Sequence, residues 1–405
     1  MRCGLLGEHL GHSWSPQIHH FLGNYSYDLF EVPPEGLERF LKSGDFDGLN
    51  VTIPYKKAVM PFCAKLSPAA KAMGCVNTIV RKPDGSLCGD NTDLDGFLWL
   101  LNRMGGVRPG EKALVLGSGG ASGTVQAVLR SQGVKVVQIS RTGLDNYSNY
   151  GRHRDADLLI NATPVGMYPG NGECLIDLRK LPDLRLVLDL VYNPLRTRLL
   201  LEAEERSLPC ENGLPMLVAQ AKKASELFTG EQLPDSLQEK ILCKLKVGMQ
   251  NLILIGMPGC GKSTVGLRLA MALNRPFYDC DLEIERQAGC SIPEYFSRFG
   301  EAAFREKETA VLKELGKKTG SIISTGGGCV TRRENRNLLR QNGLVIRLDR
   351  DLNRLSSGGR PVTAAKGLSR LFSERDSLYR EFTDITIDNN GPISQTIDNI
   401  LEVLK

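Results

Sequence analysis

The sequence predicts an α/β protein in which two nucleotide-binding units of different kinds follow one another along the chain. Short apolar runs that favour buried strands lead into glycine-rich turns and then helices, once near residue 117 and once near residue 256. The length of 405 residues is enough for two to three domains. Because ligands collect at the carboxyl ends of strands in open α/β sheets, we expect functional residues to follow these strands directly.

The second glycine turn lies within residues 251–264 and fits the pattern G-x-x-x-x-G-K-[ST] between a strand and an apolar helix. Glycines there let backbone N–H groups converge on phosphate oxygens, and the helix start adds positive potential. Lys262 can reach the β- and γ-phosphates, and the Ser263 hydroxyl can bind Mg²⁺. The alternative is a plain glycine turn before an amphipathic helix. We expect residues 249–405 to form one nucleotide-binding domain.

The composition is that of a soluble globular protein, with 41% hydrophobic and 24% charged residues. A net charge of +5 without a long basic run suits anionic small molecules and argues against nucleic acid as the main partner. No apolar run approaches the length of a membrane span, and the first residues lack a signal-peptide core. Eleven cysteines without a C-x-x-C pair indicate reduced thiols, so we expect a cytoplasmic protein.

Polar residues follow the predicted strands of the first hundred residues. Ser13 and Ser15 precede a predicted helix, where a substrate carboxylate could bind, although Ser15 could equally be a plain helix N-cap. A strand near residue 50 ends before two lysines, and these residues alone do not decide between Lys56 and Lys57. Asp93 stands at the start of another predicted helix, where it could serve only as a cap.

The first glycine turn, residues 117–123, lies between a predicted strand and a predicted helix, and a second strand follows. Dinucleotide binding requires such a βαβ unit, although Ser122 replaces the third glycine of G-x-G-x-x-G. The second strand ends in Arg141 and not in an acidic residue. An acidic residue would bind the ribose 2′-OH of NAD, whereas arginine suits the 2′-phosphate of NADP. The alternative is an exposed arginine at a strand end.

Residues 2–230 resemble shikimate dehydrogenase. The matching motifs are Ser13-x-Ser15, Asn50-Val-Thr52-x-Pro54-x-Lys56, Val76-Asn77-Thr78, Gly89-Asp90-Asn91-Thr92-Asp93, the turn from Gly117 to Ser122, Asn161-Ala-Thr163 and Leu217-Val-Ala-Gln220. The resemblance implies reversible reduction of 3-dehydroshikimate to shikimate by NADPH. It also implies an α/β substrate domain at 1–103 completed by 213–232, a Rossmann NADP domain at 104–212 and a linker at 233–248.

The resemblance makes Lys56 and Asp93 the catalytic pair. Hydride delivered to a carbonyl carbon leaves an alkoxide, which a lysine held by a carboxylate can protonate, and the same lysine can act as base in reverse. The resemblance further implies substrate binding by Ser13, Ser15, Thr52, Lys56, Asn77, Asp93, Tyr192 and Gln220, and cofactor binding by Gly117, Ser118, Gly119, Gly120, Ala121, Ser140, Arg141, Thr142 and Gly213.

The predicted cofactor domain departs from the family after Arg141, where the chain up to the next strand is much shorter than usual. We expect a helix of this domain to be reduced there, together with a strand. Asp145 stands where the family often carries a second arginine. A preference for NADP therefore rests mainly on Arg141 and Thr142, with Arg152 or Arg154 as further candidates.

Three motifs follow the phosphate loop. Asp279 and Asp281 flank one residue at a predicted strand end and should share a face, where one acid can support Mg²⁺ and the other accept a hydroxyl proton. Arg305 and Glu308 lie one helical turn apart and can pair. The three glycines at 326–328 suggest close backbone approach to a ligand. A solvated strand end, a surface pair and a plain loop are the structural alternatives.

Residues 250–405 resemble shikimate kinase through the phosphate loop and these motifs, together with Arg360-Pro361 in a short polar segment that suits a mobile lid, and Glu374-Arg375-x-x-Leu-Tyr379. The resemblance implies a five-stranded parallel sheet, with Asp281 as base at the 3-hydroxyl and Lys262 and Arg360 stabilising the phosphoryl group. It assigns shikimate to Asp281, Arg305, Gly326, Gly327, Gly328 and Arg375, ATP to Gly259, Cys260, Gly261, Lys262, Ser263, Thr264, Arg354 and Arg360, and Mg²⁺ to Ser263 and Asp279.

The two resemblances support one another, because the product of the first site is the substrate of the second. The sequence therefore predicts a bifunctional enzyme that reduces 3-dehydroshikimate with NADPH and then phosphorylates shikimate with MgATP to shikimate 3-phosphate. One alternative is a quinate/shikimate dehydrogenase fused to a related small-molecule kinase, and another is a non-catalytic metabolite sensor. A further hypothesis makes Cys260 a reactive thiolate in the phosphate loop, against the alternative of an inert buried thiol. The oligomeric state stays open.

Overall fold

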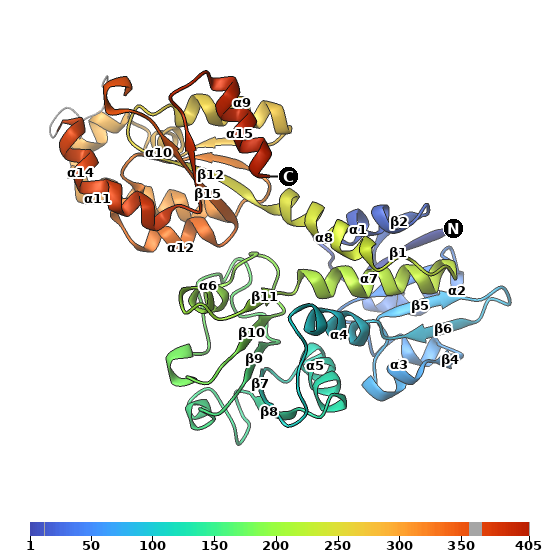
Figure 1. Ribbon diagram of the computed structural model, residues 1–405. Helices are drawn as coiled ribbons and strands as arrows, with labels where there is room; N and C mark the ends of the chain where they lie inside the picture. The colour runs from blue at the N-terminus through green and yellow to red at the C-terminus, as the bar shows by residue number, and fades with distance from the viewer. Residues whose placement is uncertain (12, 356–366, 405) are drawn as a thin grey trace. The chain divides into compact units, whose positions relative to one another are not determined.

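The computed structural model describes residues 1–11, 13–355 and 367–404. The chain divides into two compact units, each of which is described by itself (Figure 1). The first unit consists of Met1–Met167, Gly172–Tyr192 and Glu202–Lys244, and the second of Tyr168–Asn171, Asn193–Leu201 and Leu245–Lys405. None of the helices in these described ranges combines the length and apolar character needed to cross a bilayer. The finer domain limits given above stay predictions.

The first sheet has six strands and carries the functional residues of the first hundred positions. Its strands lie in the order β2 (Ser26–Glu31), β1 (Arg2–Gly7), β3 (Gly48–Val51), β5 (Thr78–Arg81), β6 (Leu87–Asp90) and β4 (Lys65–Leu66). The central strand β3 is buried along its whole length, and Leu6, Leu49 and Ile79 belong to the core around it. Its helices are α1 (Ser15–Leu22), α2 (Leu37–Ser43), α3 (Pro68–Met73) and α4 (Asp93–Arg103).

The second sheet is parallel throughout, in the order β11 (Cys210–Asn212), β10 (Leu186–Asp189), β9 (Leu158–Asn161), β7 (Lys112–Leu116) and β8 (Lys135–Ile139) (Figure 1). The nearby helices in the chain are α5 (Gly120–Ser131), α6 (Arg198–Glu205), α7 (Leu214–Thr229) and α8 (Ser236–Met249). Residues 140–157, all of them described, hold one isolated bridge and the 3₁₀ turn Tyr150–Arg152 and no helix or strand. This confirms the predicted reduction, and β8 is consequently an edge strand.

The third sheet belongs to the second unit and has five parallel strands, which confirms the prediction. Their order is β13 (Phe277–Asp279), β14 (Ile322–Ser324), β12 (Asn251–Ile255), β15 (Gly343–Asp349) and β16 (Ile385–Asp388). The helices are α9 (Lys262–Leu273), α10 (Cys280–Ala288), α11 (Ile292–Gly316), α12 (Glu334–Arg340), α14 (Leu368–Phe382) and α15 (Ile393–Val403). All five residues of β12 are buried, so the phosphate loop leaves the sheet at its centre.

Candidate active sites

A cavity of about 390 Å³ in the first unit is lined by residues of β1 and β3 in the first sheet and by residues that directly follow β10 and β11 of the second sheet. The sequence-predicted substrate residues all line it: Ser13, Ser15, Thr52, Lys56, Asn77, Asp93, Tyr192 and Gln220. Ala121 and Gly213 of the predicted cofactor set line it as well. The tertiary structure therefore brings together residues that lie more than two hundred positions apart in the chain.

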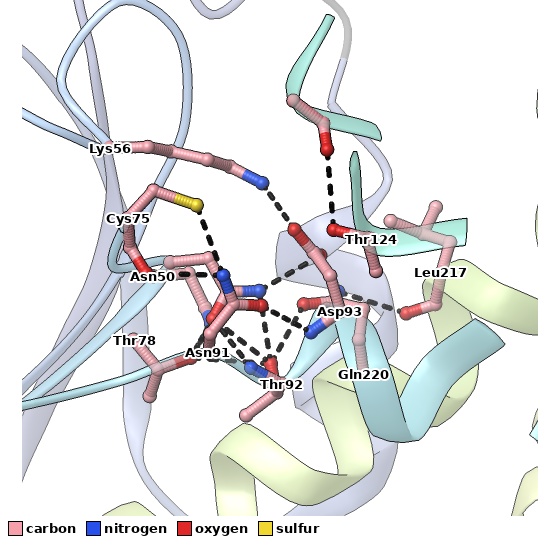
Figure 2. Close-up of polar contacts among 12 residues, drawn as sticks. Asn50, Lys56, Cys75, Thr78, Asn91, Thr92, Asp93, Thr124, Leu217 and Gln220 are labelled. Atoms are coloured by element: carbon pink, nitrogen blue, oxygen red, sulfur yellow. Dashed lines mark hydrogen bonds and ion pairs between the residues drawn. The ribbon is translucent and has the colours of Figure 1, made fainter. Parts of the chain in front are cut away.

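Lys56 and Asp93 form an ion pair at this cavity, with Lys56 Nζ 2.6 Å from Asp93 Oδ2. Figure 2 shows the ammonium group pointing directly at the carboxylate. The two side chains keep 31% and 17% of their surface exposed, so the pair is partly shielded and still open to a ligand. Lys57 is exposed and is absent from the cavity lining. Lys56, the lysine that the resemblance implies, therefore lines the cavity, and Lys57 does not.

One neighbouring side-chain amide, that of Asn77, holds the Asp93 carboxylate in place. Asn77 Nδ2 donates to Asp93 Oδ1 at 2.9 Å, and Asn77 Oδ1 accepts from the Thr92 backbone N–H at 2.8 Å. Helix α4 begins at Asp93, and the Thr92 side chain makes no capping hydrogen bond. Asp93 is therefore directed at Lys56 and does not act as a simple helix cap. Asn77, predicted to contact substrate, also positions the Asp93 carboxylate.

Ser15 is not a helix cap either. Helix α1 begins at Ser15 itself, and its N-cap residue Trp14 makes no side-chain capping bond. Ser13 Oγ accepts a hydrogen bond of 3.2 Å from the Ser15 backbone N–H. Both serines line the cavity at the start of this helix, so the alternative interpretation as a cap is wrong.

Part of the cavity wall was missed from the sequence. Asn50 lines the cavity, accepts from Tyr27 Oη at 2.7 Å and donates to Thr78 at 3.3 Å. Its place in the same motif as Thr52 could have identified Asn50 as a cavity residue. Met216 also lines the cavity, but an apolar residue in an amphipathic helix carries no signal that separates a pocket wall from a core.

The first glycine turn is built for close backbone approach. Gly117 has a φ of +103°, and the Ser122 hydroxyl donates to the Gly117 carbonyl at 2.7 Å. Ser122 thus ties the turn at the position where the motif usually has glycine. Open space surrounds Gly119 and Gly120, since a Cβ added to either would meet no atom within 4 Å. At Gly213 a Cβ would lie 2.1 Å from the Leu190 carbonyl oxygen, so only glycine fits.

The arginines after β8 separate into two kinds. Arg141 is exposed and makes no hydrogen bond or ion pair with any residue that the structure describes. Arg152 donates to Asp145 from Nε at 2.9 Å, and His153 also contacts this carboxylate. His153 and Arg152 hold the pKa of Asp145 below its usual value. Arg152 is therefore engaged by Asp145, and Arg141 is the better candidate for a phosphate.

In the second unit, the phosphate loop has positive φ angles at Gly256, Gly259 and Gly261, as glycine permits. Gly261 leads directly into α9, whose first residue is Lys262. The side chain of Lys262 is buried, and Nζ donates to the carbonyl oxygens of Gly256 at 3.0 Å and Met257 at 3.1 Å. The ammonium group therefore lies within the loop and satisfies its carbonyls.

Asp279 and Asp281 do not share a strand face, so this prediction is wrong. Strand β13 ends at Asp279, whose carboxylate caps α10 by accepting from the backbone N–H of Asp281 at 3.0 Å. The capping geometry prevails because the first N–H groups of a helix need acceptors. The other Asp279 oxygen accepts from Ser263 Oγ at 2.6 Å, which brings the two predicted Mg²⁺ residues together.

The triple glycine is where the predicted shikimate-binding side chains converge. A Cβ at Gly326 would lie 2.9 Å from Asp281 Oδ1, and one at Gly328 would lie 2.1 Å from Arg305 Nη1. Arg375 Nη1 donates to the Gly327 carbonyl at 2.9 Å. These approaches of protein side chains leave no room for a side chain on the turn, whereas close approach to a ligand stays a prediction.

Arg305 is held by a buried carboxylate. Its Nη1 donates to Glu308 Oε2 at 2.7 Å, and Glu308 has no exposed surface. Burial raises the pKa of Glu308 against the attraction of Arg305. Burial lowers the pKa of Arg305, but the attraction of Glu308 and Glu301 together outweighs it, so the pKa of Arg305 is raised. The ion-pair geometry favours the charged pair, so Arg305 is a fixed guanidinium at the site.

The nucleotide side of the second unit is only partly described. Arg354 ends the 3₁₀ turn Leu352–Arg354 and donates to the Asn390 carbonyl at 2.6 Å, whereas Arg360 lies outside the described residues. Cys260 has no exposed surface, and its sulfur lies 3.9 Å from Lys262 Nζ. The structure therefore favours an inert buried thiol over the hypothesis of a reactive one.

Comparisons with known proteins agree with this geometry. Residues 258–405 match the family model for shikimate kinase, and residues 5–79 match the model for the shikimate dehydrogenase substrate binding domain. The shikimate dehydrogenase (NADP(+)) of Methanopyrus kandleri is 40% identical over 277 residues, which cover 60% of this chain and 95% of that protein. That of Thermus thermophilus is 40% identical over 252 residues, covering 58% and 94%.

Solved structures give the same result for the first three fifths of the chain. A chorismate mutase/shikimate 5-dehydrogenase fusion protein from Clostridium acetobutylicum has a TM-score of 0.58 at 34% identity and covers 60% of this chain and 96% of that one. A quinate dehydrogenase from Corynebacterium glutamicum in complex with NAD has a TM-score of 0.55 at 27% identity, covering 60% and 99%. The chain belongs to the shikimate dehydrogenase family and joins an NADP-dependent shikimate dehydrogenase to a shikimate kinase domain in one bifunctional enzyme of the shikimate pathway.

Proposed function

We propose that Lys56 and Asp93 carry out the proton transfer of the dehydrogenase reaction. When a hydride reaches the ketone carbon of 3-dehydroshikimate, the carbonyl oxygen becomes an alkoxide and needs a proton. Lys56 can supply it, because its ammonium group faces the cavity and Asp93 holds it at 2.6 Å. In the reverse direction the same lysine removes the hydroxyl proton of shikimate. The single observation that carries this proposal is the Lys56–Asp93 pair at the wall of a polar cavity.

The other polar residues of the cavity would orient the substrate. Ser13 and Ser15 lie at the start of α1, where hydroxyl and backbone N–H donors suit a carboxylate. Thr52, Tyr192 and Gln220 present both donors and acceptors, which ring hydroxyls require because a hydroxyl is itself both. A cavity of about 390 Å³ is at the small end of ligand sites, as expected for a single ring.

NADPH supplies the hydride when it is bound to the first unit. The open space over Gly119 and Gly120 fits a pyrophosphate at the start of α5. Arg141, which is exposed and makes no ion pair with a described residue, fits a 2′-phosphate. Ser118, Ser140 and Thr142 remain proposed contacts on the strength of their positions in the two turns. Ala121 lines the substrate cavity, which supports delivery of the nicotinamide end to that side.

In the second unit we assign Asp281 the role of base at the 3-hydroxyl of shikimate. Arg305 and Arg375 would bind the substrate carboxylate, where a planar guanidinium is a stronger partner than an ammonium group. Lys262 would leave its loop carbonyls to meet the phosphates of ATP, and Arg354 would contact the adenine. The neighbouring oxygens of Ser263 and Asp279 are the hard donors that Mg²⁺ prefers, directly or through water.

A coupled assay tests both halves together. The purified protein is supplied with 3-dehydroshikimate, NADPH and MgATP, and we expect oxidation of NADPH and formation of shikimate 3-phosphate. Omission of ATP should leave shikimate as the product, and omission of NADPH should prevent both steps. The proposal fails if the protein neither oxidises shikimate nor consumes ATP with it.

Quinate is the second candidate substrate of the first unit, supported by the quinate dehydrogenase among its structural neighbours. Comparing quinate with shikimate as the reductant of NADP⁺, at equal concentrations, distinguishes the two.

The assembled Lys56–Asp93 pair favours catalysis over a metabolite sensor. An inactive Lys56→Ala protein that still supports growth without aromatic supplements would instead favour the sensor. We also propose a cytoplasmic location, where NADPH, ATP and reduced thiols are all supplied.

A further inference from the structure

One buried hydroxyl joins the phosphate loop to the triple glycine. Tyr379 lies in α14 and has no exposed surface. Its Oη is 3.0 Å from the carbonyl oxygen of Gly256, the first residue of the phosphate loop, and 2.5 Å from the carbonyl oxygen of Gly327. Neither contact was anticipated from the sequence, where Tyr379 was only the last residue of a family motif.

Each of these two carbonyls has a second donor. Lys262 Nζ donates to the Gly256 carbonyl at 3.0 Å, and Arg375 Nη1 donates to the Gly327 carbonyl at 2.9 Å. A continuous set of hydrogen bonds therefore runs from the proposed phosphate-binding ammonium to the proposed carboxylate-binding guanidinium, with Tyr379 at its centre. Three donors are present for two carbonyl oxygens, so one of them is not needed to give each carbonyl a hydrogen bond.

This additional donor is the tyrosine hydroxyl. Burial raises the pKa of Tyr379 far above its usual value, so the hydroxyl keeps its proton. A hydroxyl has a single proton and can donate to only one of its two neighbours at a time. While Lys262 donates to the Gly256 carbonyl, we assign the hydroxyl proton of Tyr379 to the shorter of its two contacts, the one with Gly327.

The proposed reaction removes one of these donors. Lys262 must turn toward a β- or γ-phosphate to act on the nucleotide, and the Gly256 carbonyl would then lose its ammonium partner. A buried carbonyl without a donor is unfavourable, because its lost contact with water is not replaced. The Tyr379 hydroxyl lies within hydrogen-bond distance and can take the place of Lys262.

We propose that Tyr379 is a positioning residue that donates to the Gly256 carbonyl when Lys262 turns to a bound nucleotide. The inference rests on the proposed role of Lys262. When the hydroxyl turns, Gly327 keeps Arg375 as its donor, so both carbonyls are satisfied in either arrangement. Tyr379 thereby lowers the cost of withdrawing Lys262 without itself touching a ligand.

A double-mutant cycle on MgADP binding tests this exchange in the full-length protein. The dissociation constant is measured by calorimetry for wild type, Tyr379→Phe, Lys262→Met and the double variant. We expect Tyr379→Phe to weaken MgADP binding about tenfold in the wild-type background, as expected for one stranded carbonyl. In the Lys262→Met background no donor is withdrawn on binding, so the same change should alter the constant less than twofold.

Two controls separate this role from a structural one. Tyr295→Phe removes a hydroxyl from the same unit at a half-buried tyrosine of α11 and should change MgADP binding less than twofold. Replacing Tyr379 with para-aminophenylalanine keeps an N–H donor and should retain wild-type affinity. This variant also provides the test if the phenylalanine variant proves unstable. Equal losses in both Lys262 backgrounds, no loss in either, or weak binding by the amino variant would each overturn the inference. Absence of MgADP binding by wild type would instead remove the proposed kinase function and the inference with it.

Discussion

The two active sites differ in how far their charged groups are already arranged for chemistry. In the first unit Lys56 is paired with Asp93, and Asn77 holds the carboxylate, so the proposed proton donor is already at the cavity. In the second unit Lys262 donates to a carbonyl of its own phosphate loop, and Arg375 of α14 donates to the Gly327 carbonyl of the triple glycine. The proposed proton transfer can therefore begin from the arrangement in the first unit, whereas the proposed ligand-binding cations of the second unit would have to exchange partners.

The two regions also differ in what can titrate near neutral pH. All five histidines lie within the first 153 residues, and the kinase region has none. His19 is fully buried beside the cavity network, stacked on Tyr27 with ring centroids 3.9 Å apart. Its Nδ1 is 2.6 Å from Tyr25 Oη. Lowering the pH should consequently change the free energy of unfolding of the two units differently.

Removal of the preassembled proton donor should have the largest effect. Lys56→Ala is expected to lower the dehydrogenase kcat by roughly 10³- to 10⁴-fold, because it removes the proposed donor of the proton to the alkoxide. The kinase activity of the same protein should be unchanged. Lys57→Ala is the matched control, since Lys57 is an exposed neighbour outside the cavity. Comparable losses in both variants, measured by NADPH oxidation, would contradict the assignment.

The kinase counterpart is Asp281→Asn, which removes the proposed base. We expect kcat for shikimate phosphorylation to fall roughly 10²- to 10³-fold with little change in shikimate affinity, because Arg305 and Arg375 remain. Glu283→Gln, in the same helix α10, removes a surface ion pair with Arg286 and should leave kcat within twofold. Coupled detection of ADP measures both variants. A purely binding role for Asp281 would instead raise KM and leave kcat unchanged.

A smaller effect is expected at the cofactor turn. Arg141→Gln should raise the KM for NADPH by about 10- to 100-fold, as expected for loss of a charge-assisted contact with the 2′-phosphate, and leave the KM for NADH unchanged. Arg152→Gln should affect NADPH far less, because Asp145 already engages Arg152. Initial rates with the two cofactors provide the measurement. An equal change for NADH and NADPH would show that Arg141 does not read the 2′-phosphate.

The smallest expected effect is the pH dependence from His19. Burial lowers the pKa of His19 to about 3, below its usual value of 6.5. Below pH 6.5 His19 therefore binds a proton in the unfolded chain but not in the folded unit. The free energy of unfolding consequently falls as the pH drops through 6.5 toward 3. At pH 5.5 the loss from this group is about 1.4 kcal/mol relative to neutral pH.

Both tryptophans, Trp14 and Trp99, lie in the first unit, so tryptophan fluorescence during urea unfolding reports this unit alone. The difference between wild type and His19→Phe at pH 7.5 and pH 5.5 isolates the histidine from other titrating groups. We expect the wild type to lose more stability on acidification than the variant. An equal loss in both proteins would mean that His19 is not the titrating group.

Local sequence patterns determined the elements and the chemistry of both sites. The strand, glycine turn and helix around Lys262, the βαβ unit before Arg141 and the clustering of substrate residues after strand ends were all predicted, because each depends on neighbouring residues and on the shared edge of parallel strands. The Asp279 prediction failed for a local reason, since a carboxylate at a helix start binds free N–H groups before it can share a strand face.

Only the tertiary structure decided which side chains meet. The engagement of Arg152 by Asp145, the burial of Cys260 and the contacts of Tyr379 with Gly256 and Gly327 all depend on residues that are distant in the chain or on the direction of a side chain. A pattern of residue types defines what a group can do. The packing of separate elements defines its partner, because hydrogen bonds and ion pairs act only over a few ångströms.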